Sequence, residues 1–336
     1  MTSPKELTPP AEGDDSAAGA GGEEFHWVRV TDFIRRYGVV ILLVILFLTL
    51  SFSSDAFFSP RNLLNILNQN TPLAIIAMAG TLVIIAGGFD LSTGAMFAVA
   101  AVSASWIGLH VNEVLGMVLA PVVGLILGLI NGLVVTGLRV HSFLATLATS
   151  LVYRGLAVLI TGGSLISLTN NETFSALGRG RIWQINYSVF ILMAAFLGFS
   201  FLLTRTVPGR HIYAVGGNLN AAILSGVRNL RIQVLTFALS GLAAGVAGAI
   251  TVSRVATGSA QAGLGLELTA IAAVILGGTS IYGGEGAVWR SFAGVMLLAL
   301  INNGFNILNA NPFYRELTTG VIIVLAVALS AGKKRR

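Results

Sequence analysis

The chain has 336 residues, of which 55% are hydrophobic and only 10% are charged, and its mean hydropathy is +0.84. A soluble domain is about a quarter charged, so this composition excludes an ordinary soluble protein and indicates a polytopic membrane protein. The sequence contains no cysteine, which excludes disulfides, thiolate metal sites and a cysteine nucleophile. The net charge of +6 is explained by basic residues retained on the cytoplasmic side of a membrane rather than by nucleic-acid binding.

The N-terminal part of the chain is expected to precede the first membrane span. Residues 1–24 are rich in Pro, Gly, Ala and acidic residues, which predicts a disordered cytoplasmic tail. Residues 25–37 (FHWVRVTDFIRRY) mix aromatic and basic side chains, as in an amphipathic segment at the membrane interface. Because many apolar runs follow and no small-residue cleavage site is evident, the first run is expected to be an anchor rather than a signal peptide.

The transmembrane domain is expected to be all-α and to cover residues 38–332. Apolar runs long enough to cross about 30 Å of hydrocarbon predict about ten helices. We place them at residues 38–52, 64–85, 94–109, 114–136, 143–160, 187–203, 232–253, 268–282, 288–307 and 317–330. Merging the short neighbouring runs would give about eight or nine spans instead.

The distribution of basic residues indicates the orientation. An even number of spans places both termini on one side of the membrane. The basic C-terminal tail, residues 333–336, and the arginines before the first span indicate that this side is the cytoplasm. The longest segment on the opposite side, residues 161–186, is polar; it forms either a small external cap or gate helix, or a passive connector.

Residues 205–231 are the most polar stretch after the N-terminal tail. A Pro-Gly pair near the start predicts a turn, and a Gly-Gly-Asn sequence predicts a break. A short helix is expected over residues 220–226, with Asn218 or Asn220 capping its start and Gly226 ending it. A short, capped helix between two spans on the basic side is expected to dock another protein. The alternative is an ordinary cytoplasmic loop whose arginines only fix the topology.

The sequence IAGGFDLSTG, residues 85–94, separates the second and third spans. Our leading interpretation is structural: Asp90 or Ser92 caps the third span, and Gly94 allows close packing. The alternative is that Asp90 meets substrate or a charged partner where a helix is broken. A second glycine-rich break, GGTSIYGGEG at residues 277–286, has a similar composition, as in an internal repeat.

Polar side chains inside the apolar spans are candidates for a translocation pathway. Amides and hydroxyls without a catalytic acid suit hydrogen bonding to a hydroxyl-rich solute; the alternative is contact between helices, at about 1 kcal/mol each. An arginine at membrane depth is costly, which makes Arg154 a functional candidate unless it snorkels to the boundary. The pathway candidates are Asn68, Asn70, Asp90, Ser92, Asn131, Thr146, Thr149, Arg154, Asn302 and Asn303.

Several motifs are missing from the sequence. There is no P-loop, so the chain is not expected to hydrolyse ATP itself. Zinc-protease and serine-hydrolase motifs are also missing, and the histidines are too scattered for a metal cluster. We therefore expect no catalytic residues, no cofactor and no metal.

Four segments, in order along the chain, resemble the permease subunits of bacterial monosaccharide ABC importers of the ribose/xylose type. These permeases belong to a larger family that also contains branched-chain amino-acid permeases. The segments are AGGFDLSTGAMFAVAA (86–101), NGLVVTGLRVHSFLATLATSLVYRGLAVLITGG (131–163), GRHIYAVGGNLNAAILSGVRN (209–229) and AIAAVILGGTSIYGGEGAVWRSFAGVMLLALINNGFNIL (270–308). The resemblance runs from about residue 62 to the C-terminus. The sequence departs from the family at His141 and Phe89, where proline and isoleucine are frequent, which could affect an inner gate or packing.

The resemblance implies a dimer of permease chains, often identical, with about ten spans each and the pathway between them. It further implies two cytoplasmic ATPase domains, an external sugar-binding protein and a location in the bacterial plasma membrane. Residues 205–231 match the coupling loop, whose short helix sits in a cleft of the ATPase. The implied ATPase-coupling residues are Gly209, Arg210, Tyr213, Gly216, Gly217, Asn218, Ala221, Ala222, Ser225 and Gly226.

The expected function is the import of a monosaccharide, or a similar small neutral polyhydroxylated solute, by alternating access driven by partner ATPases. The same architecture could carry a nucleoside, a polyol or a branched-chain amino acid. A stand-alone secondary carrier or channel is a further alternative, although it would need more intramembrane carboxylates. An intramembrane enzyme is disfavoured because catalytic motifs are missing.

Overall fold

The computed structural model describes residues 20–168, 171–311, 313–314, 317–318, 320–321 and 324, with side chains from residue 37 onward. The chain divides into two units, Met1–Gly38 and Val39–Arg336, and helix α1 (Ala20–Ser53) contains residues of both. Because α1 begins at Ala20, the end of the expected disordered tail is helical. The same helix also covers the expected interfacial segment and first span. The rest of the tail lies outside the described residues.

Most of the expected spans correspond to helices of the second unit. Six described helices are long and apolar enough to cross a membrane. They are α2 (Pro60–Ile85), α3 (Thr93–His110), α4 (Glu113–Leu138), α5 (Ser142–Thr161), α7 (Tyr187–Arg205) and α10 (Asn229–Val255). Helix α12 (Val288–Ile307) has the expected bounds. The total of about ten spans and their orientation stay predictions.

Helix α11 (Leu266–Leu276) is shorter than the expected span at residues 268–282, because the chain leaves the helix at Gly277. An added Cβ on Gly277 would collide with the carbonyl oxygen of Arg290 in α12, so this position needs glycine where the two helices meet. The span expected at residues 317–330 and the basic tail lie mostly or wholly outside the described residues.

Helix α10 packs against α2, α3 and α4, and its contact with α4 is the most extensive in the unit. Glycines at every fourth position of α4 let the two backbones touch. An added Cβ on Gly124 would collide with the carbonyl oxygen of Gly241, and one on Gly128 with that of Phe237. Small residues at this spacing are a frequent means of close helix packing in membranes. This helix pair therefore forms a tightly joined centre of the bundle.

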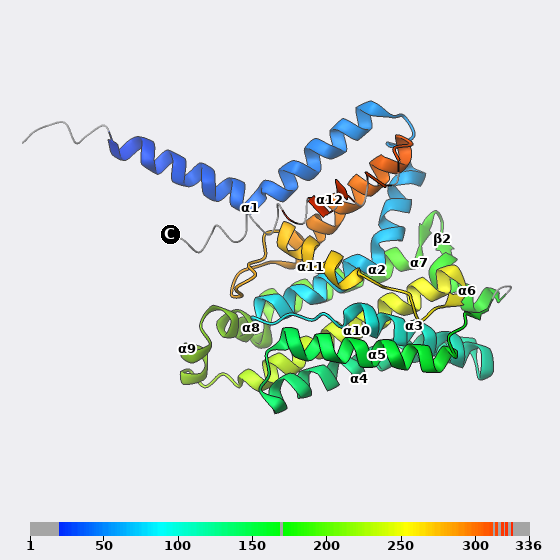
Figure 1. Ribbon diagram of the computed structural model, residues 1–336. Helices are drawn as coiled ribbons and strands as arrows, with labels where there is room; N and C mark the ends of the chain where they lie inside the picture. Colours follow the sequence, from blue (N-terminus) through cyan, green and yellow to red (C-terminus); the bar gives the residue numbers. More distant parts are fainter. Residues whose placement is uncertain are drawn as a thin grey trace, which may run out of the picture. The chain divides into compact units, whose positions relative to one another are not determined.

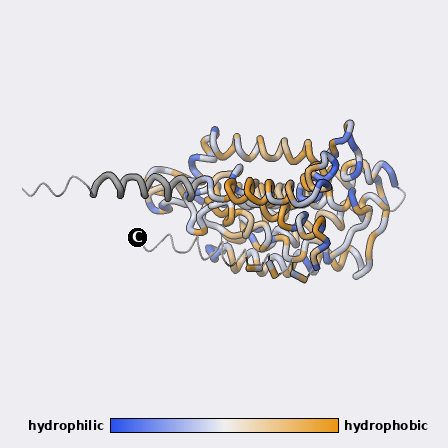
Figure 2. Tube along the Cα trace, turned by 90° about the horizontal axis from the view of Figure 1, so that it is seen from above, coloured by the Kyte–Doolittle hydropathy of each residue, from blue (hydrophilic) through white to orange (hydrophobic). Residues whose placement is uncertain are grey.

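The second unit has two distinct ends (Figure 1). Helices α8 (Val207–Gly217) and α9 (Leu219–Leu224) lie at one end, which we call the coupling-helix end. The opposite end, which we call the hairpin end, carries α6 and the antiparallel strands β2 and β3. Figure 2 shows hydrophobic residues along the helices and hydrophilic residues gathered toward the ends. The bounds are α6 (Glu172–Arg179), β2 (Arg181–Ile182) and β3 (Ile185–Asn186).

Two non-helical links enter the bundle from these ends. The α2–α3 link, residues 86–92, begins beside the coupling helices, and the α10–α11 link, residues 256–265, begins beside the hairpin end. There β4 (Thr257–Gly258) pairs antiparallel with β1 (Ile166–Ser167). The links meet in the interior, where Gly263 of the second link contacts the first turn of α3. Helix α3 therefore begins inside the protein, in contact with the link that leads into α11.

Candidate functional site

Asp90 lies buried in the α2–α3 link, with both carboxylate oxygens occupied. Its Oδ1 accepts hydrogen bonds from the backbone N–H of Ser92 at 3.0 Å and from the Ser92 hydroxyl at 2.6 Å. Its Oδ2 accepts a hydrogen bond from Ser240 of α10 at 2.7 Å. The prediction that the Ser92 side chain caps α3 is wrong, whereas the Asp90 side chain does accept the backbone N–H of the N-cap residue. Ser92 is the N-cap residue, but its hydroxyl makes no capping bond because it is directed to Asp90.

The hydrogen bonds continue from Ser92 into two further helices. Asn131 of α4 donates from Nδ2 to the Ser92 hydroxyl at 2.6 Å. The hydroxyl of Tyr153, on α5, lies 2.9 Å from Asn131 Oδ1, to which it donates. We call Asp90, Ser92, Asn131, Tyr153 and Ser240 the Asp90 network. It brings together three of the pathway candidates and joins the α2–α3 link to three helices.

The first two turns of α5 also hold the backbone of the α2–α3 link. The Ser142 hydroxyl accepts from the N–H of Phe89, and the Thr146 hydroxyl accepts from the N–H of Leu91, both at 3.0 Å. Thr146 is thus part of this interior region. Thr149 instead donates to the Thr146 carbonyl on its own helix at 3.2 Å.

Arg154 of α5 binds the backbone of the α10–α11 link. Its Nη1 donates to the carbonyl oxygens of Ala260 and Ala262 at 2.7 and 2.8 Å. A guanidinium group at membrane depth is costly unless it finds such acceptors. The structure therefore places Arg154 as a brace between α5 and the α10–α11 link, rather than as a side chain that reaches the boundary.

The remaining pathway candidates lie toward the hairpin end and are not brought to one place. Asn68 accepts from the Ser188 hydroxyl of α7 at 2.5 Å, and its backbone oxygen accepts from Arg254 at 3.0 Å. Asn303 and Asn62 exchange two side-chain hydrogen bonds, which join α12 to α2. Asn70 donates to the Ile66 carbonyl of its own helix at 2.8 Å. Asn302 is half-buried on α12.

Asn68 also lines a polar cavity of about 500 Å³ at the hairpin end. This volume lies within the range of about 300–1,000 Å³ that is usual for small-molecule sites. Its lining combines amides, one hydroxyl and two arginines with a single aliphatic side chain. The lining residues are Ser59, Arg61, Asn62, Leu64, Asn65, Asn68, Arg181, Gln184 and Asn186.

At the other end of the unit, residues 205–231 form two helices rather than one. The predicted turn at the Pro-Gly pair is wrong, because Pro208 occupies the first turn of α8 and Thr206 caps that helix. The predicted cap of the second helix is confirmed: Asn218 Oδ1 accepts from the N–H of Ala221 at 3.0 Å. Gly226, with φ of +82°, adopts the left-handed conformation that follows α9.

The residues that the resemblance implies for ATPase coupling fall into two groups. The first group is exposed and available to a partner: Arg210, Gly217, Asn218, Ala221, Ser225 and Gly226. The second group is buried or half-buried and faces the rest of the chain: Gly209, Tyr213, Gly216 and Ala222. A docking role therefore fits the first group, and a transmitting role fits the second.

The end of α8 packs backbone to backbone against two other segments. An added Cβ on Gly216 would collide with the carbonyl oxygen of Ile85, the last residue of α2, and one on Gly284 would lie 2.7 Å from the Cα of Gly217. Gly284 also donates its N–H to the Ile85 carbonyl at 2.9 Å. We call this contact the glycine joint. It connects the coupling helices directly to the link that carries Asp90.

Tyr213 reinforces the glycine joint. Its hydroxyl donates to the carbonyl oxygen of Gly286 at 2.8 Å. Burial raises the pKa of Tyr213 above its ordinary value, so the hydroxyl keeps its proton, and with it the hydrogen bond, throughout the neutral pH range.

The family model described as branched-chain amino acid transport system / permease component matches residues 62–327. The chain belongs to this family. It is 40% identical over 302 residues to the ribose import permease protein RbsC of Bacillus subtilis, a match that covers 89% of this chain and 94% of the relative. The RbsC of Escherichia coli is 38% identical over 299 residues, covering 88% and 93% of the two chains. No solved structure matches the chain significantly.

A permease for a second sugar is also similar to the chain. The L-arabinose ABC transporter permease protein AraH of Azospirillum brasilense is 34% identical over 299 residues, covering 89% of this chain and 88% of the relative. These matches confirm the resemblance found in the sequence. The chain is a multi-pass permease subunit of a bacterial ABC importer in the cell membrane and not an enzyme, and it works with ATPase and substrate-binding partners.

Proposed function

We propose that this permease imports a monosaccharide, with pentoses as the first candidates. The observation that carries the proposal is the 40% identity to a ribose permease over 94% of that relative's length. The interior chemistry agrees with it. The Asp90 network consists of hydroxyls, an amide and one carboxylate whose oxygens are both occupied, so it offers no free charged pair for the ends of a zwitterionic amino acid.

We infer that the coupling-helix end faces the cytoplasm and docks the ATPase. The exposed arginines Arg205, Arg210, Arg228 and Arg231 gather in this region, as the positive-inside rule requires of cytoplasmic loops. The hairpin end, with its cavity of about 500 Å³, would then receive sugar from the binding protein. Under this orientation both termini are cytoplasmic. We further propose that two copies of the chain form the complete permease.

The proposed mechanism is alternating access driven through the glycine joint. Closure of the ATPase subunits on ATP moves α8 and α9. Because Gly216 lies against the end of α2 without an intervening side chain, this movement reaches the α2–α3 link without being absorbed by side-chain rotation. The link then transmits the movement to α3 at its other end, and the interior opens to one side or the other.

The direct test is transport by the purified importer in proteoliposomes, with the partner ATPase inside and the binding protein outside. We expect ATP-dependent uptake of radiolabelled D-ribose or L-arabinose. Uptake that continues without ATP would support a secondary carrier instead. Uptake of leucine, a nucleoside or a polyol, with no uptake of any monosaccharide, would place the chain with a different solute of the same architecture.

A further inference from the structure

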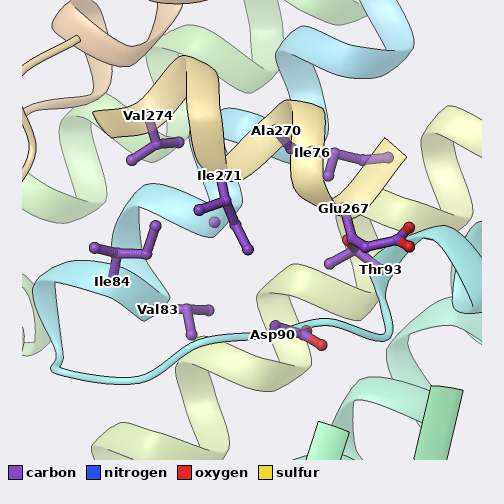
Figure 3. Close-up of a pocket in the computed structure, with 10 residues that line it drawn as sticks. Ile76, Val83, Ile84, Asp90, Thr93, Glu267, Ala270, Ile271 and Val274 are labelled. Atoms are coloured by element: carbon purple, nitrogen blue, oxygen red, sulfur yellow. The ribbon is translucent and has the colours of Figure 1, made fainter. Parts of the chain in front are cut away.

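Helix α3 begins inside the bundle, and its first turn is in contact with the first turn of α11. An added Cβ on Gly94 would collide with Oε2 of Glu267 and with the carbonyl oxygen of Gly263. The Glu267 carboxylate therefore lies against the N-terminal turn of α3. Figure 3 shows Glu267 beside Thr93, the first residue of that helix.

The N-terminal turn of α3 has hydrogen-bond donors to offer. The first amide to enter the helical hydrogen-bond pattern is that of Met96, which donates to the Ser92 carbonyl at 2.8 Å. The amides of the preceding turn have no helical acceptor, as at every helix start. The N-cap residue Ser92 makes no side-chain capping bond to them.

Two buried oxygen atoms beside this turn lack a hydrogen-bond partner within the described part of the chain. They are Oγ1 of Thr93 and Oε2 of Glu267. Thr93 is only 3% exposed, so water at the protein surface does not reach its hydroxyl. Buried polar atoms are nearly always hydrogen-bonded in folded proteins, so a ligand group that pairs with both atoms is expected here. Asp90 differs, because hydrogen bonds occupy both of its oxygens.

Thr93 and Glu267 line one small pocket, together with Asp90 and an apolar wall from α2 and α11 (Figure 3). Its volume of about 10 Å³ is close to the minimum of roughly 10–15 Å³ that accommodates one water-sized group. Gly80 of α2 lines the same pocket and is half-exposed, with open space where a Cβ would be. A single polar group can therefore be held here while the rest of a solute lies past Gly80.

We propose that Thr93, Glu267 and the first turn of α3 bind a hydroxyl group of the sugar in transit. A sugar hydroxyl donates one hydrogen bond and accepts others. It can donate to the Glu267 carboxylate and accept from Thr93 or from an amide of α3. A cation is a poorer ligand, because the positive ends of two helix dipoles meet at this point. The apolar wall formed by Ile76, Val83 and Ile271 suits the C–H face of the ring. This inference rests on the proposed import of a monosaccharide.

The first test is uptake of radiolabelled D-ribose by the complete importer in proteoliposomes. Glu267→Gln keeps the size of the side chain but removes the charge-assisted acceptor, and Thr93→Val removes the hydroxyl. Glu267→Gln is expected to lower uptake about tenfold, as for the loss of a hydrogen bond to a charged group, and Thr93→Val, which removes a neutral hydrogen bond, is expected to lower it by less. Stimulation of ATP hydrolysis by the binding protein should persist, because the glycine joint is intact. The control is Thr204→Val, whose hydroxyl donates only to Ser200 of its own helix in the described structure.

A second test uses the cysteine-free background of this chain. Gly80→Cys places the only thiol in the open space beside the pocket, and Gly137→Cys places it in equally open space on α4. In the complete importer, D-ribose with the binding protein should slow thiol modification at residue 80 but not at residue 137.

The outcomes separate the two proposals. Wild-type uptake by Glu267→Gln, or equal modification of residue 80 with and without ribose, would overturn the hydroxyl site while leaving sugar import intact. Failure of the wild-type importer to take up any monosaccharide would instead overturn the proposed function.

Discussion

The hydroxyl of Ser240 on α10 donates to Oδ2 of Asp90 at 2.7 Å, although the two residues are 150 positions apart in the sequence. This bond fixes a non-helical link to the helix at the centre of the bundle. A carboxylate buried in a membrane protein is costly unless donors satisfy it, and here the donors come from the link itself and from α10. The presence of a buried carboxylate at Asp90 is thus explained by a structural role, which is to join the α2–α3 link to α10.

The first prediction concerns the Asp90 network. Asp90→Ala should lower the Tm of the purified permease, because the hydroxyls of Ser92 and Ser240 lose their acceptor at a cost of about 1–3 kcal/mol for each buried group. Asp90→Asn retains one acceptor oxygen and should lower Tm less. The measurement is thermal unfolding in detergent. Equal Tm values for Asp90→Ala and the wild type would contradict the role assigned to the network.

The second prediction concerns Gly216 of the glycine joint. Gly216→Ala should abolish ATP-driven uptake, because the methyl group would collide with the Ile85 carbonyl and displace α8. Gly198→Ala, on α7 and outside the joint, is the control, since an added Cβ there has no neighbour within 4 Å. Both variants should appear in the membrane at wild-type amounts on immunoblots. Similar uptake by the two variants would show that the joint does not transmit movement.

The third prediction concerns Tyr213. Tyr213→Phe removes one hydrogen bond of about 1 kcal/mol between α8 and the loop that precedes α12, without changing the packing of the ring. We expect the purified importer to move fewer sugar molecules per ATP hydrolysed, with little change in Tm. Tyr187→Phe, on an exposed residue of α7, is the control. An unchanged ratio of uptake to ATP hydrolysis would rule out this contribution of Tyr213.

The fourth prediction concerns the contact between α4 and α10. Gly128→Leu should prevent folding or lower Tm sharply, because no atom larger than hydrogen fits between Gly128 and the Phe237 carbonyl. Gly137→Leu, on the same helix, has open space for its Cβ and should fold normally. Detergent-soluble yield and size-exclusion profiles would report the difference. A monodisperse Gly128→Leu protein at normal yield would contradict the packing described.

Hydropathy alone predicted where most helices lie. The bounds of α12 agree with the expectation residue for residue, and the cap of α9 at Asn218 was also expected, because side-chain caps are local and depend on few neighbours. The length of α11 was not predicted. Its end is determined by the contact of Gly277 with Arg290 on the next helix, and an apolar run carries no signal for such a contact.

The candidate site was predicted only in part. Asp90, Ser92 and Asn131 were selected because polar residues in apolar runs are conspicuous, and the structure brings them together. Ser240 was missed because a lone serine is common in membrane helices. Glu267 was missed because the sequence placed it just outside a span, whereas the α10–α11 link carries it into the interior. The pairing of distant links depends on tertiary packing, which no local pattern records.

The glycines between α4 and α10 also limit how this permease can move. Sliding one helix along the other by a single residue would bring Leu or Val side chains to positions that accept only hydrogen. The two helices must therefore travel as one rigid body, because packed interiors do not deform continuously. The gap that admits a solute therefore has to open at another helix contact of the bundle.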